Sequence, residues 1–275
     1  MTRAAQSTAL DVADAMRSTL ARRIADAGCD WIVPRWPAPA GVHAFATTRN
    51  GGVCVGACAS LDLGGASIGS ASPDAAARVA ENRRRVQAFL PSPPAWLTQV
   101  HGAEVVAIDA PAPSDPPRAD AAVTRRANVV LAVRIADCMP VLFADRAGTV
   151  IAAAHAGWRG LAAGVLENTL DAMNAEPAQI VAWLGPAIGP TAFEVGTDVR
   201  DAFVRNDAQA HVAFAAASPG KWLADLESLA RMRLSRAGVR SIHGGGMCTF
   251  RDPARFFSFR RDGTSGRMGA FVWRS

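Results

Sequence analysis

The 275-residue sequence predicts an α+β fold in which a mixed β-sheet is flanked by helices. Short apolar runs typical of strands follow one another closely between residues 96 and 154. They are too numerous and too tightly clustered for the regular strand–helix alternation of a parallel α/β fold. Segments with helical periodicity precede and follow this series, and a proline-rich loop from Pro111 to Pro117 interrupts it. With 50% hydrophobic and 19% charged residues, the composition is that of a globular protein rather than a disordered or coiled-coil chain.

The N-terminal part of the chain predicts a helix followed by an extended connection. Residues 8–27 have helical character, and Gly28 ends this segment. Three prolines between residues 31 and 40 favour an extended chain there. We therefore expect residues 1–40 to form an N-terminal helical appendage and residues 41–275 to form a single domain.

The remaining elements follow from capping residues and apolar runs. Ser72 as N-cap, Pro73 as first helical residue and Asp74 in the first turn predict a helix that reaches Leu90. Further helices are expected at residues 161–173, 198–204 and 223–237, the last closed by Gly238. Strands are expected at residues 42–47, 96–100, 104–108, 121–124, 129–136, 141–144, 149–154, 180–184, 256–259 and 270–273, and near Ser241.

Composition excludes several classes of protein. No apolar run approaches the roughly 20 residues that span a membrane, and the N-terminus lacks the apolar block of a secretory signal. Five cysteines, an odd number, then indicate reduced thiols in the cytoplasm. The net charge is +5, but 24 acidic residues are interspersed and no Lys/Arg block exceeds three residues, so nucleic acid is not an expected partner. Tyrosine is absent and Lys221 is the single lysine, so the basic groups are almost all guanidinium, which suits phosphate or carboxylate.

Three reactive side chains stand at the ends of apolar runs, close to glycine in two cases. They are His101 in LTQVHGAEV, Cys138 in LAVRIADCMPVLFAD and His155 in VIAAAHAGWRG. The strands after Cys138 and before His155 flank the short segment 146–148, which is typical of a hairpin turn. Pairing residue 145 with 148 or 149 places Cys138 opposite residue 155 or 156, where side chains are neighbours.

This nitrogen–sulfur set suits Zn²⁺, with copper as the competing ion, and three protein ligands leave a fourth position for water or substrate. The same atoms also fit a Cys–His nucleophile pair, with Asp137 or Gln99 orienting the imidazole. A buried structural cysteine with two hydrogen-bonded histidines is the third interpretation.

Loop arginines and one indole are candidates for substrate contacts. Arg159 and the backbone amides of HAGWRG precede a helix, where a phosphate can bind. Arg49 in TTRNGG and Arg261 in SFRRDG lie in loops beside strands, and Trp158 offers a flat ring for a base. The alternative for each arginine is surface solvation, and for the tryptophan a place in the core. Asn82 lies on the apolar face of its helix, where we expect it to hydrogen-bond the preceding loop.

Several motifs, in order between Phe45 and Trp273, resemble the YfiH family, once labelled laccase-domain or multicopper polyphenol oxidase proteins. They are TTRNGGV, ENRRRV, TQVHGAEV, ADCMPVLFAD, AAHAGWRG, WLGPAIGPTAFEVG, CTF and FFSFRRDGTSGRMGAFVW. The resemblance implies a layered α+β catalytic domain and a zinc held by the His of QVHG, the Cys of ADC and the His of HAGWRG, here His101, Cys138 and His155. It also implies purine nucleoside phosphorylase activity, with adenosine deaminase and methylthioadenosine phosphorylase activities beside it. Some members are tied to peptidoglycan editing.

The chain departs from the family pattern at three positions around the expected substrate pocket. Asp62 stands where the family usually has Asn, Thr191 stands where a Cys often follows Gly-Pro, and Ser70 replaces a frequent acidic residue. The three ligand positions do not depart from it.

The number of histidines and the absence of one motif exclude two kinds of metal enzyme. Five histidines cannot ligate a four-copper oxidase cluster, so a laccase mechanism is excluded for a monomer. Neither H-x-E nor P-C-x-x-C, the signature of zinc cytidine-type deaminases, occurs in the chain.

We therefore expect a cytoplasmic zinc enzyme that acts on purine nucleosides (adenosine, inosine, guanosine or methylthioadenosine) and phosphate, with no nucleic-acid or membrane partner. The catalytic and metal-binding residues would be His101, Cys138 and His155. The substrate would contact one indole and three guanidinium groups, those of Trp158, Arg49, Arg159 and Arg261. The alternatives are a cysteine-type amidase that edits peptidoglycan precursors and a copper- or zinc-binding protein without turnover. The sequence indicates no particular oligomeric state.

Overall fold

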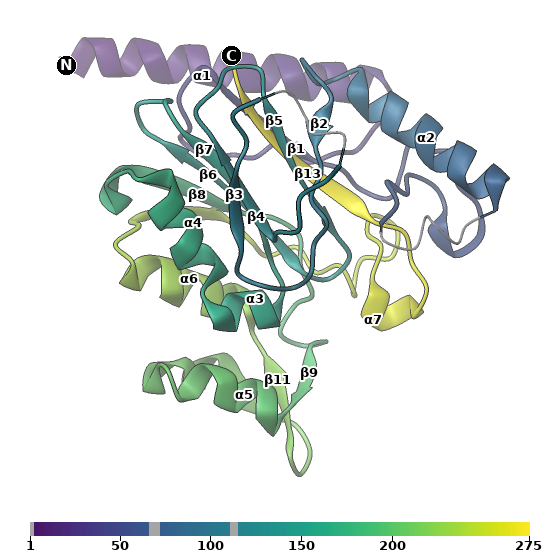
Figure 1. Ribbon diagram of the computed structural model, residues 1–275, viewed down its shortest axis with the longest axis vertical. Coiled ribbons are helices and arrows are strands. Elements are labelled where there is room, and N and C mark those ends of the chain that lie inside the picture. Colours follow the sequence, from purple (N-terminus) through teal and green to yellow (C-terminus); the bar gives the residue numbers. More distant parts are fainter. Residues whose placement is uncertain (1–2, 66–71, 111–114) are drawn as a thin grey trace.

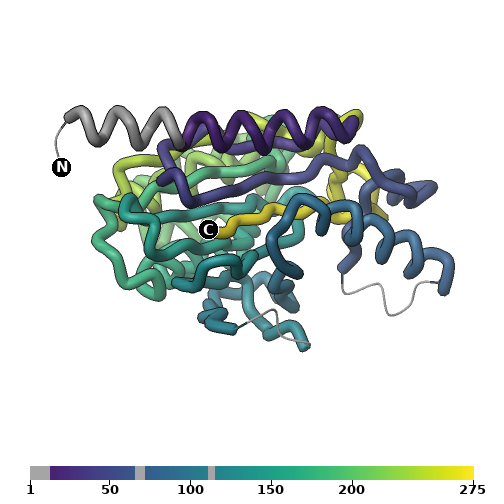
Figure 2. Tube along the Cα trace, turned by 90° about the horizontal axis from the view of Figure 1, so that it is seen from above, coloured from purple at the N-terminus to yellow at the C-terminus, as the bar shows by residue number. Residues whose placement is uncertain are grey.

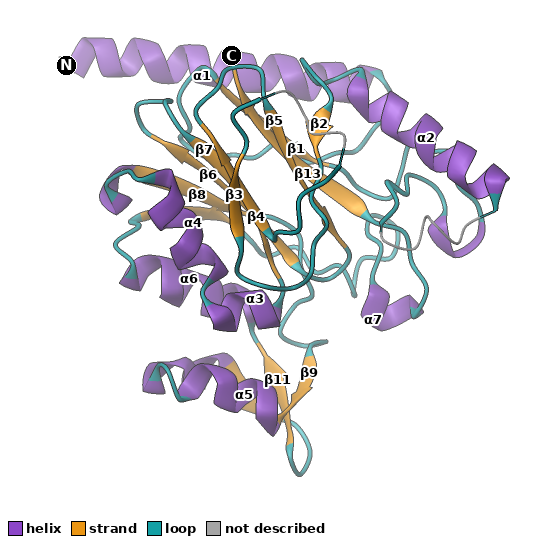
Figure 3. Cartoon of the chain, in the orientation of Figure 1, coloured by secondary structure: helices purple, strands orange, loops and turns teal. Residues whose placement is uncertain are grey.

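Two β-sheets stacked face to face form the centre of the protein, and helices lie outside them (Figures 1 and 3). The computed structural model describes residues 3–65, 72–110 and 115–275, and the side chains from residue 13 onward within these ranges. The larger sheet has the order β12-β8-β6-β7-β4-β3 and the smaller one the order β1-β13-β5-β2. Each sheet contains parallel and antiparallel pairs. The expected α+β fold of layered mixed sheets with flanking helices is confirmed.

The elements have the following bounds. The six-stranded sheet comprises β3 (Val105–Ala107), β4 (Ala121–Thr124), β6 (Met139–Asp145), β7 (Ile151–Ala156), β8 (Ile180–Leu184) and β12 (Ser241–Gly244). The four-stranded sheet comprises β1 (Val42–Ala46), β2 (Pro94–Ala95), β5 (Val130–Ile135) and β13 (Met268–Arg274). A small third sheet comprises β9 (Glu194–Gly196), β10 (Phe214–Ala216) and β11 (Lys221–Ala224). The helices are α1 (Arg3–Asp26), α2 (Pro73–Gln87), α3 (Trp158–Ala163), α4 (Val165–Met173), α5 (Thr197–Val204), α6 (Leu226–Arg236) and α7 (Phe259–Asp262).

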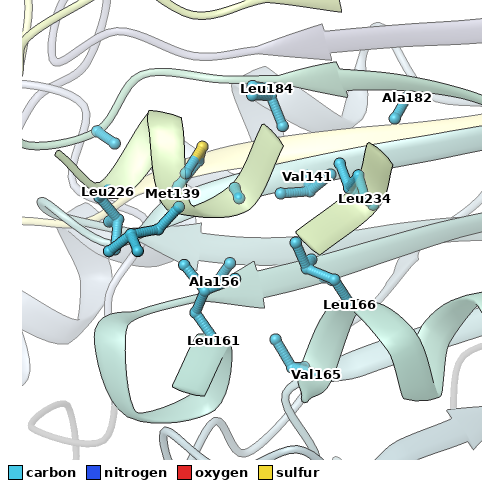
Figure 4. Packing of buried hydrophobic residues seen from close by; sticks show 14 of the residues in the cluster. Met139, Val141, Ala156, Leu161, Val165, Leu166, Ala182, Leu184, Leu226 and Leu234 are labelled. Carbon is cyan, nitrogen blue, oxygen red and sulfur yellow. The ribbon is translucent and has the colours of Figure 1, made fainter. Parts of the chain in front are cut away.

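Alternating side chains of the central strands fill the layers between sheets and helices. On β6, Leu142 and Ala144 pack against the four-stranded sheet, whereas Val141 and Phe143 belong to the cluster under the helices. Because successive side chains point to opposite faces and both faces are buried, these strands read as continuous apolar runs. Figure 4 shows the helix-facing layer, in which strand residues meet Leu161, Val165 and Leu166 of the α3–α4 pair and Leu226 and Leu234 of α6.

Helix α1 lies along one side of the molecule, as Figure 2 shows from above. Leu20 and Ile24 from its C-terminal half are buried in one cluster with Phe45 of β1 and Phe271 of β13. The chain leaves the helix at Gly28, whose φ of +71° favours glycine. None of the helices in the described ranges is both long and apolar enough to cross a membrane.

Three predicted elements differ in the structure. The helix expected at 161–173 is broken by Gly164, at φ +96°, into α3 and α4. The helix expected from residue 223 begins only at Leu226, because residues 221–224 form β11 and the Asp225 carboxylate caps the helix by accepting from Ser228 N. The strand expected at 256–259 is wrong: Phe256 and Phe257 are both buried as neighbours, and Ser258 caps α7.

The other differences from the predicted strands involve an isolated β-bridge and very short strands. The strand expected at 96–100 contributes one isolated bridge, Thr98 to Arg118, while the pairing with β5 is made earlier, by Pro94 and Ala95. Strands β9 and β10, three residues each, were not predicted. Such short strands carry too few residues to show an alternating pattern.

The turn between β6 and β7 sets the register of the pair that carries Cys138 and His155. The Asp145 carboxylate accepts hydrogen bonds from Thr149 N at 2.7 Å and Val150 N at 2.9 Å, which closes a loop longer than the predicted one. Pro140 then pairs with His155. Continuing that register places Cys138 opposite Gly157, not opposite residue 155 or 156 as predicted.

Candidate metal centre

Three side chains from separate segments converge at one end of the six-stranded sheet. One ligand atom each from His101, Cys138 and His155 lies within 4.8 Å of the other two. The two imidazole rings are 4.9 Å apart between centroids and nearly perpendicular, at 78°. His155 is buried, Cys138 is half-buried and His101 is exposed, so the group opens to solvent on the His101 side. Within the residues that the structure describes, no other group of three or more such side chains could hold a metal ion.

Two glycines of HAGWRG make this convergence possible. A Cβ on Gly157 would stand 2.8 Å from the Cys138 sulfur and 3.3 Å from Cδ2 of His101. A Cβ on Gly160 would stand 2.5 Å from the carbonyl oxygen of Gly102, so α3 packs directly against the loop that carries His101. A side chain at residue 157 would therefore collide with the Cys138 thiol and press on the His101 ring.

Asp120 organises the centre, although it was not among the predicted site residues. Its carboxylate is fully buried and accepts from Nδ1 of His155 at 2.8 Å, which leaves Nε2 for a ligand. It also accepts three backbone N–H groups, from Val100 at 3.0 Å, His101 at 3.0 Å and Gly102 at 2.7 Å. These bonds hold His101 in the left-handed conformation, at φ +62°, which is uncommon outside glycine. One carboxylate thus positions both imidazoles; its only sequence signal is an acidic residue directly before an apolar strand.

The charges of the centre favour an ionised sulfur. Burial opposes ionisation of the Cys138 thiol, but the neighbouring imidazoles, His155 before His101, lower its pKa to about 6. Burial likewise opposes protonation of His155, but the Cys138 sulfur and the Asp120 carboxylate raise its pKa to about 9. For Asp120, burial is outweighed by hydrogen bonds from His155 and Gly102, and its pKa is lowered. Both shifts favour a thiolate beside an imidazolium, and the thiolate is the form of cysteine that binds metals.

Asp137 and Gln99, the two residues expected to orient an imidazole, have other partners. The Asp137 carboxylate accepts from Thr249 Oγ1 at 2.6 Å and from Arg260 N at 2.7 Å, so it ties α7 to the Cys138 loop. Gln99 exchanges two hydrogen bonds with the backbone of Arg134, both at 2.8 Å. The expected role belongs to Asp120 instead, because the loop after residue 100 folds back over the start of β4.

Two of the predicted substrate arginines hold loops together. All five N–H groups of Arg261 are engaged, by the carbonyls of Thr249, Phe250 and Phe256 and by the Asp262 carboxylate. Arg261 therefore holds this loop region together, and its substrate contact stays a prediction. Arg49 donates to the carbonyls of Ala59 and Pro253 and keeps further donors, so its substrate contact stays a prediction.

Trp158 and Arg159 lie at the start of α3, directly after the His155 segment. The guanidinium carbon of Arg159 is 4.5 Å from the centre of the Trp158 ring, and the Arg159 residue is exposed. The Trp158 residue is half-buried and packs against the helix-facing core. It therefore contributes to the core and still has an exposed part. Substrate contacts by this pair remain predictions. The expectation for Asn82 is confirmed, since it donates to the carbonyls of Ser60 and Asp62 and accepts from Val53 N.

Known proteins resemble this chain in sequence and in fold. A family model described as multi-copper polyphenol oxidoreductase laccase matches residues 43–275. The purine nucleoside phosphorylase YfiH of Escherichia coli strain K12 is 52% identical, over 88% of this chain and 98% of that protein. The chain belongs to the YfiH family. The purine nucleoside phosphorylase PA4543 of Pseudomonas aeruginosa is 51% identical over the same shares of the two chains.

Solved structures agree with the assignment to the YfiH family. The crystal structure of Neisseria meningitidis protein NMB0706 has a TM-score of 0.84 and 49% identity, and covers 90% of this chain and 99% of that chain. YlmD from Geobacillus stearothermophilus has a TM-score of 0.76 and 35% identity, and covers 86% and 92%.

The laccase description of the family model is not matched by a copper cluster in this YfiH-family chain. Only five histidines exist, and the three outside the centre have other partners. His43 stacks on Trp273 at 5.2 Å, and His211 and His243 are hydrogen-bonded to Ala208 O and the Ser241 hydroxyl. The chain therefore lacks the imidazoles that a four-copper oxidase needs.

Proposed function

We propose that this chain is a zinc-dependent purine nucleoside phosphorylase whose metal is held by His101, Cys138 and His155. The observation that carries the proposal is the three-ligand group itself, with its buried carboxylate on the rear nitrogen of His155. Relatives with about half of their residues identical, aligned over 98% of their length, are named purine nucleoside phosphorylases. That likeness supports the same substrates, purine nucleosides and phosphate, for this chain.

The residues present fit zinc well. Two imidazole nitrogens and a thiolate are the ligands that Zn²⁺ prefers, with copper as the competing ion, and a carboxylate behind a ligating histidine is the usual partner of such a site. Three protein ligands would leave one coordination position, and the exposed His101 gives the group a solvent-facing side. When bound, zinc supplies a Lewis acid that polarises an oxygen of the substrate.

Phosphorolysis exchanges one bond at the ribose for another. The bond from C1′ to the purine nitrogen breaks, its electron pair leaves with the base, and a phosphate oxygen forms the new bond to C1′. The departing base takes up one proton, which the attacking hydrogen phosphate gives up. In this chain Trp158 would stack the base, while Arg159 and Arg49 would bind phosphate or ribose hydroxyls.

Adenosine, inosine, guanosine and methylthioadenosine are the proposed substrates, with hydrolytic deamination of adenosine as a second activity. The five cysteines carry no disulfide, which supports the proposed cytoplasmic location.

A nucleoside panel tests the proposal. The zinc-loaded protein is incubated with each nucleoside, with and without phosphate, and free base, ribose 1-phosphate and ammonia are quantified. We expect base and ribose 1-phosphate in equal amounts, only with phosphate, and no turnover by Cys138→Ala. Base release that ignores phosphate, or full activity of Cys138→Ala, would overturn the proposal. Cys29→Ala is the matched control, because Cys29 lies outside the centre and is half-buried like Cys138.

One observation favours a second candidate, a cysteine-type amidase acting on peptidoglycan precursors. The structure places a nucleophile, a base and an orienting carboxylate next to one another in space, namely Cys138, His155 and Asp120. This candidate predicts an acyl–Cys138 adduct during turnover in protein stripped of metal, whereas the phosphorylase predicts that the stripped protein is inactive and forms no adduct. Mass spectrometry of the quenched reaction separates the two.

A further inference from the structure

We propose that Arg83, Arg134 and Arg267 form a binding site for a phosphate group, on the outer face of the four-stranded sheet beside α2. These three arginines are different from Arg49 and Arg159, which we propose as substrate contacts. The proposal rests on the proposed function in one respect only: the proposed phosphorylase uses phosphate as a substrate. Its structural support is independent of that function.

The topology brings the three guanidinium groups to one face of the sheet. Arg134 lies on β5 and pairs with Gly269 of β13. Arg267 precedes Gly269 by two residues and so continues on the same face, where diagonal cross-strand side chains are within reach of each other. Arg83 reaches the same place from α2, since its Nε donates to Leu63 O at 2.9 Å and Leu63 N donates to Arg267 O at 2.9 Å.

Trp96 joins two of these cations. The guanidinium carbons of Arg83 and Arg134 lie 5.4 Å and 5.1 Å from the centre of its ring. The ring also packs edge-on against Phe271, 5.6 Å away, which fixes the indole in the outer core layer. Both guanidinium groups are therefore held on a rigid surface before any ligand arrives, and such preorganisation lowers the cost of binding.

No ion pair neutralises the positive charge of this group in the part of the chain that the structure describes. Among the described residues, none of the three arginines has a carboxylate oxygen within ion-pair distance of its guanidinium. Asp62 is the nearby carboxylate, and its Oδ1 accepts the backbone N–H groups of Gly64 and Arg267, both at 2.8 Å. Its charge attracts Arg83 and Arg134 from beyond ion-pair distance, so one carboxylate faces three guanidinium groups. Burial, followed by repulsion from Arg83 and Arg267, lowers the pKa of Arg134 to about 10. A half-buried cluster of like charges is costly, and a bound anion removes that cost.

Enough donors remain to bind a tetrahedral oxyanion. Arg83 and Arg134 each give one N–H to a protein carbonyl, of Leu63 and Leu97, and retain four. Arg267 uses NH1 for the carbonyls of Ser265 and Gly266 and keeps its other nitrogens. Planar guanidinium forks match phosphate oxygens two at a time, which is why arginine clusters select phosphate groups.

The cluster adjoins the metal centre along two chain segments. Arg134 precedes Cys138 by four residues, at most roughly 13 Å of extended chain. Gln99, two residues before His101, is bonded to the Arg134 backbone in both directions. The phosphate group can therefore belong to free inorganic phosphate or to a phosphorylated nucleoside, and the experiment needs an arm for each.

Inorganic phosphate titrated into the zinc-loaded protein tests the site by calorimetry and thermal unfolding. We expect phosphate to bind and to raise the unfolding temperature of the wild type and of Arg126→Met, an exposed arginine in the turn between β4 and β5. Arg134→Met and Arg83→Met should weaken phosphate binding roughly tenfold or more, because each removes a charged hydrogen-bond donor.

Without phosphate, Arg134→Met should unfold at the same or a higher temperature, which also shows that it folds. Arg134→Lys keeps the charge without the fork and should bind weakly too. Equal phosphate affinity in wild type and Arg134→Met would overturn the proposal.

A second arm replaces phosphate by adenosine 5′-monophosphate, with adenosine as the control. Tighter binding of the nucleotide than of phosphate, lost in Arg134→Met, identifies a phosphorylated ligand; equal or weaker binding identifies free phosphate. Because binding is measured without turnover, the two proposals fail separately. Phosphate bound through Arg134 by a protein that cleaves no nucleoside overturns only the proposed function. Phosphorolysis with an unchanged KM for phosphate and unchanged phosphate affinity in Arg134→Met overturns only the arginine site.

Discussion

The Asp120 carboxylate lies 2.8 Å from Nδ1 of His155 and is wholly buried beneath the metal centre. The same carboxylate accepts the backbone N–H of His101 at 3.0 Å, so the two candidate imidazole ligands share one anchor. A carboxylate in this position fixes the tautomer and the orientation of a ligating histidine and increases its basicity. Asp120 is therefore a positioning residue that acts through both histidines.

Replacing Asp120 should weaken metal binding without removing a ligand. We expect Asp120→Asn to lower zinc affinity about 10- to 100-fold, since an amide lacks the charge and the second acceptor oxygen. Competition with a chromophoric chelator measures this. Asp62→Asn is the control, because Asp62 is also buried and accepts backbone N–H groups, but from Gly64 and Arg267. Equal zinc affinity in wild type and Asp120→Asn would contradict the assigned role.

A methyl group at residue 157 should close the metal centre. Gly157→Ala places a Cβ 2.8 Å from the Cys138 sulfur, so the thiolate or the loop must move and zinc binding should be lost. Zinc content by atomic emission and folding by circular dichroism are measured together. Gly41→Ala, whose Cβ would meet only ordinary contacts at 3.5 Å or more, should retain zinc. A fully loaded Gly157→Ala protein would show that this space is not needed.

Removal of the metal should expose a reactive thiol. In chelator-treated protein at pH 7, iodoacetamide should label Cys138 faster than Cys29, because the Cys138 pKa is lowered whereas burial raises that of Cys29. Added zinc should protect Cys138 and leave the rate at Cys29 unchanged. Peptide mapping by mass spectrometry gives both rates. Labelling of Cys138 that is indifferent to zinc would argue against its role as a ligand.

Helix α1 should contribute to global stability even though the family match begins at residue 43. Ile24→Ala removes a buried side chain from the cluster around Phe45 and should cost about 2–5 kcal/mol of unfolding free energy. Urea unfolding followed by fluorescence measures the loss. Arg22→Ala, exposed on the same helix, should change stability little. An Ile24→Ala protein as stable as the wild type would mean that the predicted N-terminal appendage does not pack on the domain.

The individual strands could be predicted from the sequence where they are long and buried on both faces. The strand at 180–184 agrees residue for residue with β8, and β5, β6 and β7 differ only at their ends. Two features could not be predicted from the sequence: the helix break at Gly164 and the burial of both Phe256 and Phe257. They depend on the side chains that neighbouring layers of the fold pack against these residues.

By itself, the sequence determined which side chains are reactive and that they end apolar runs, which was enough to choose His101, Cys138 and His155. It also limited the metal chemistry, because five histidines cannot ligate a four-copper cluster. Only the tertiary structure decided the register that sets Cys138 against Gly157, since the Asp145 carboxylate closes the turn through bonds that leave no periodic pattern. It also decided that Asp120, rather than Asp137, supports the imidazoles. A buried carboxylate takes its partners from whichever loop folds over it, and the fold chooses that loop.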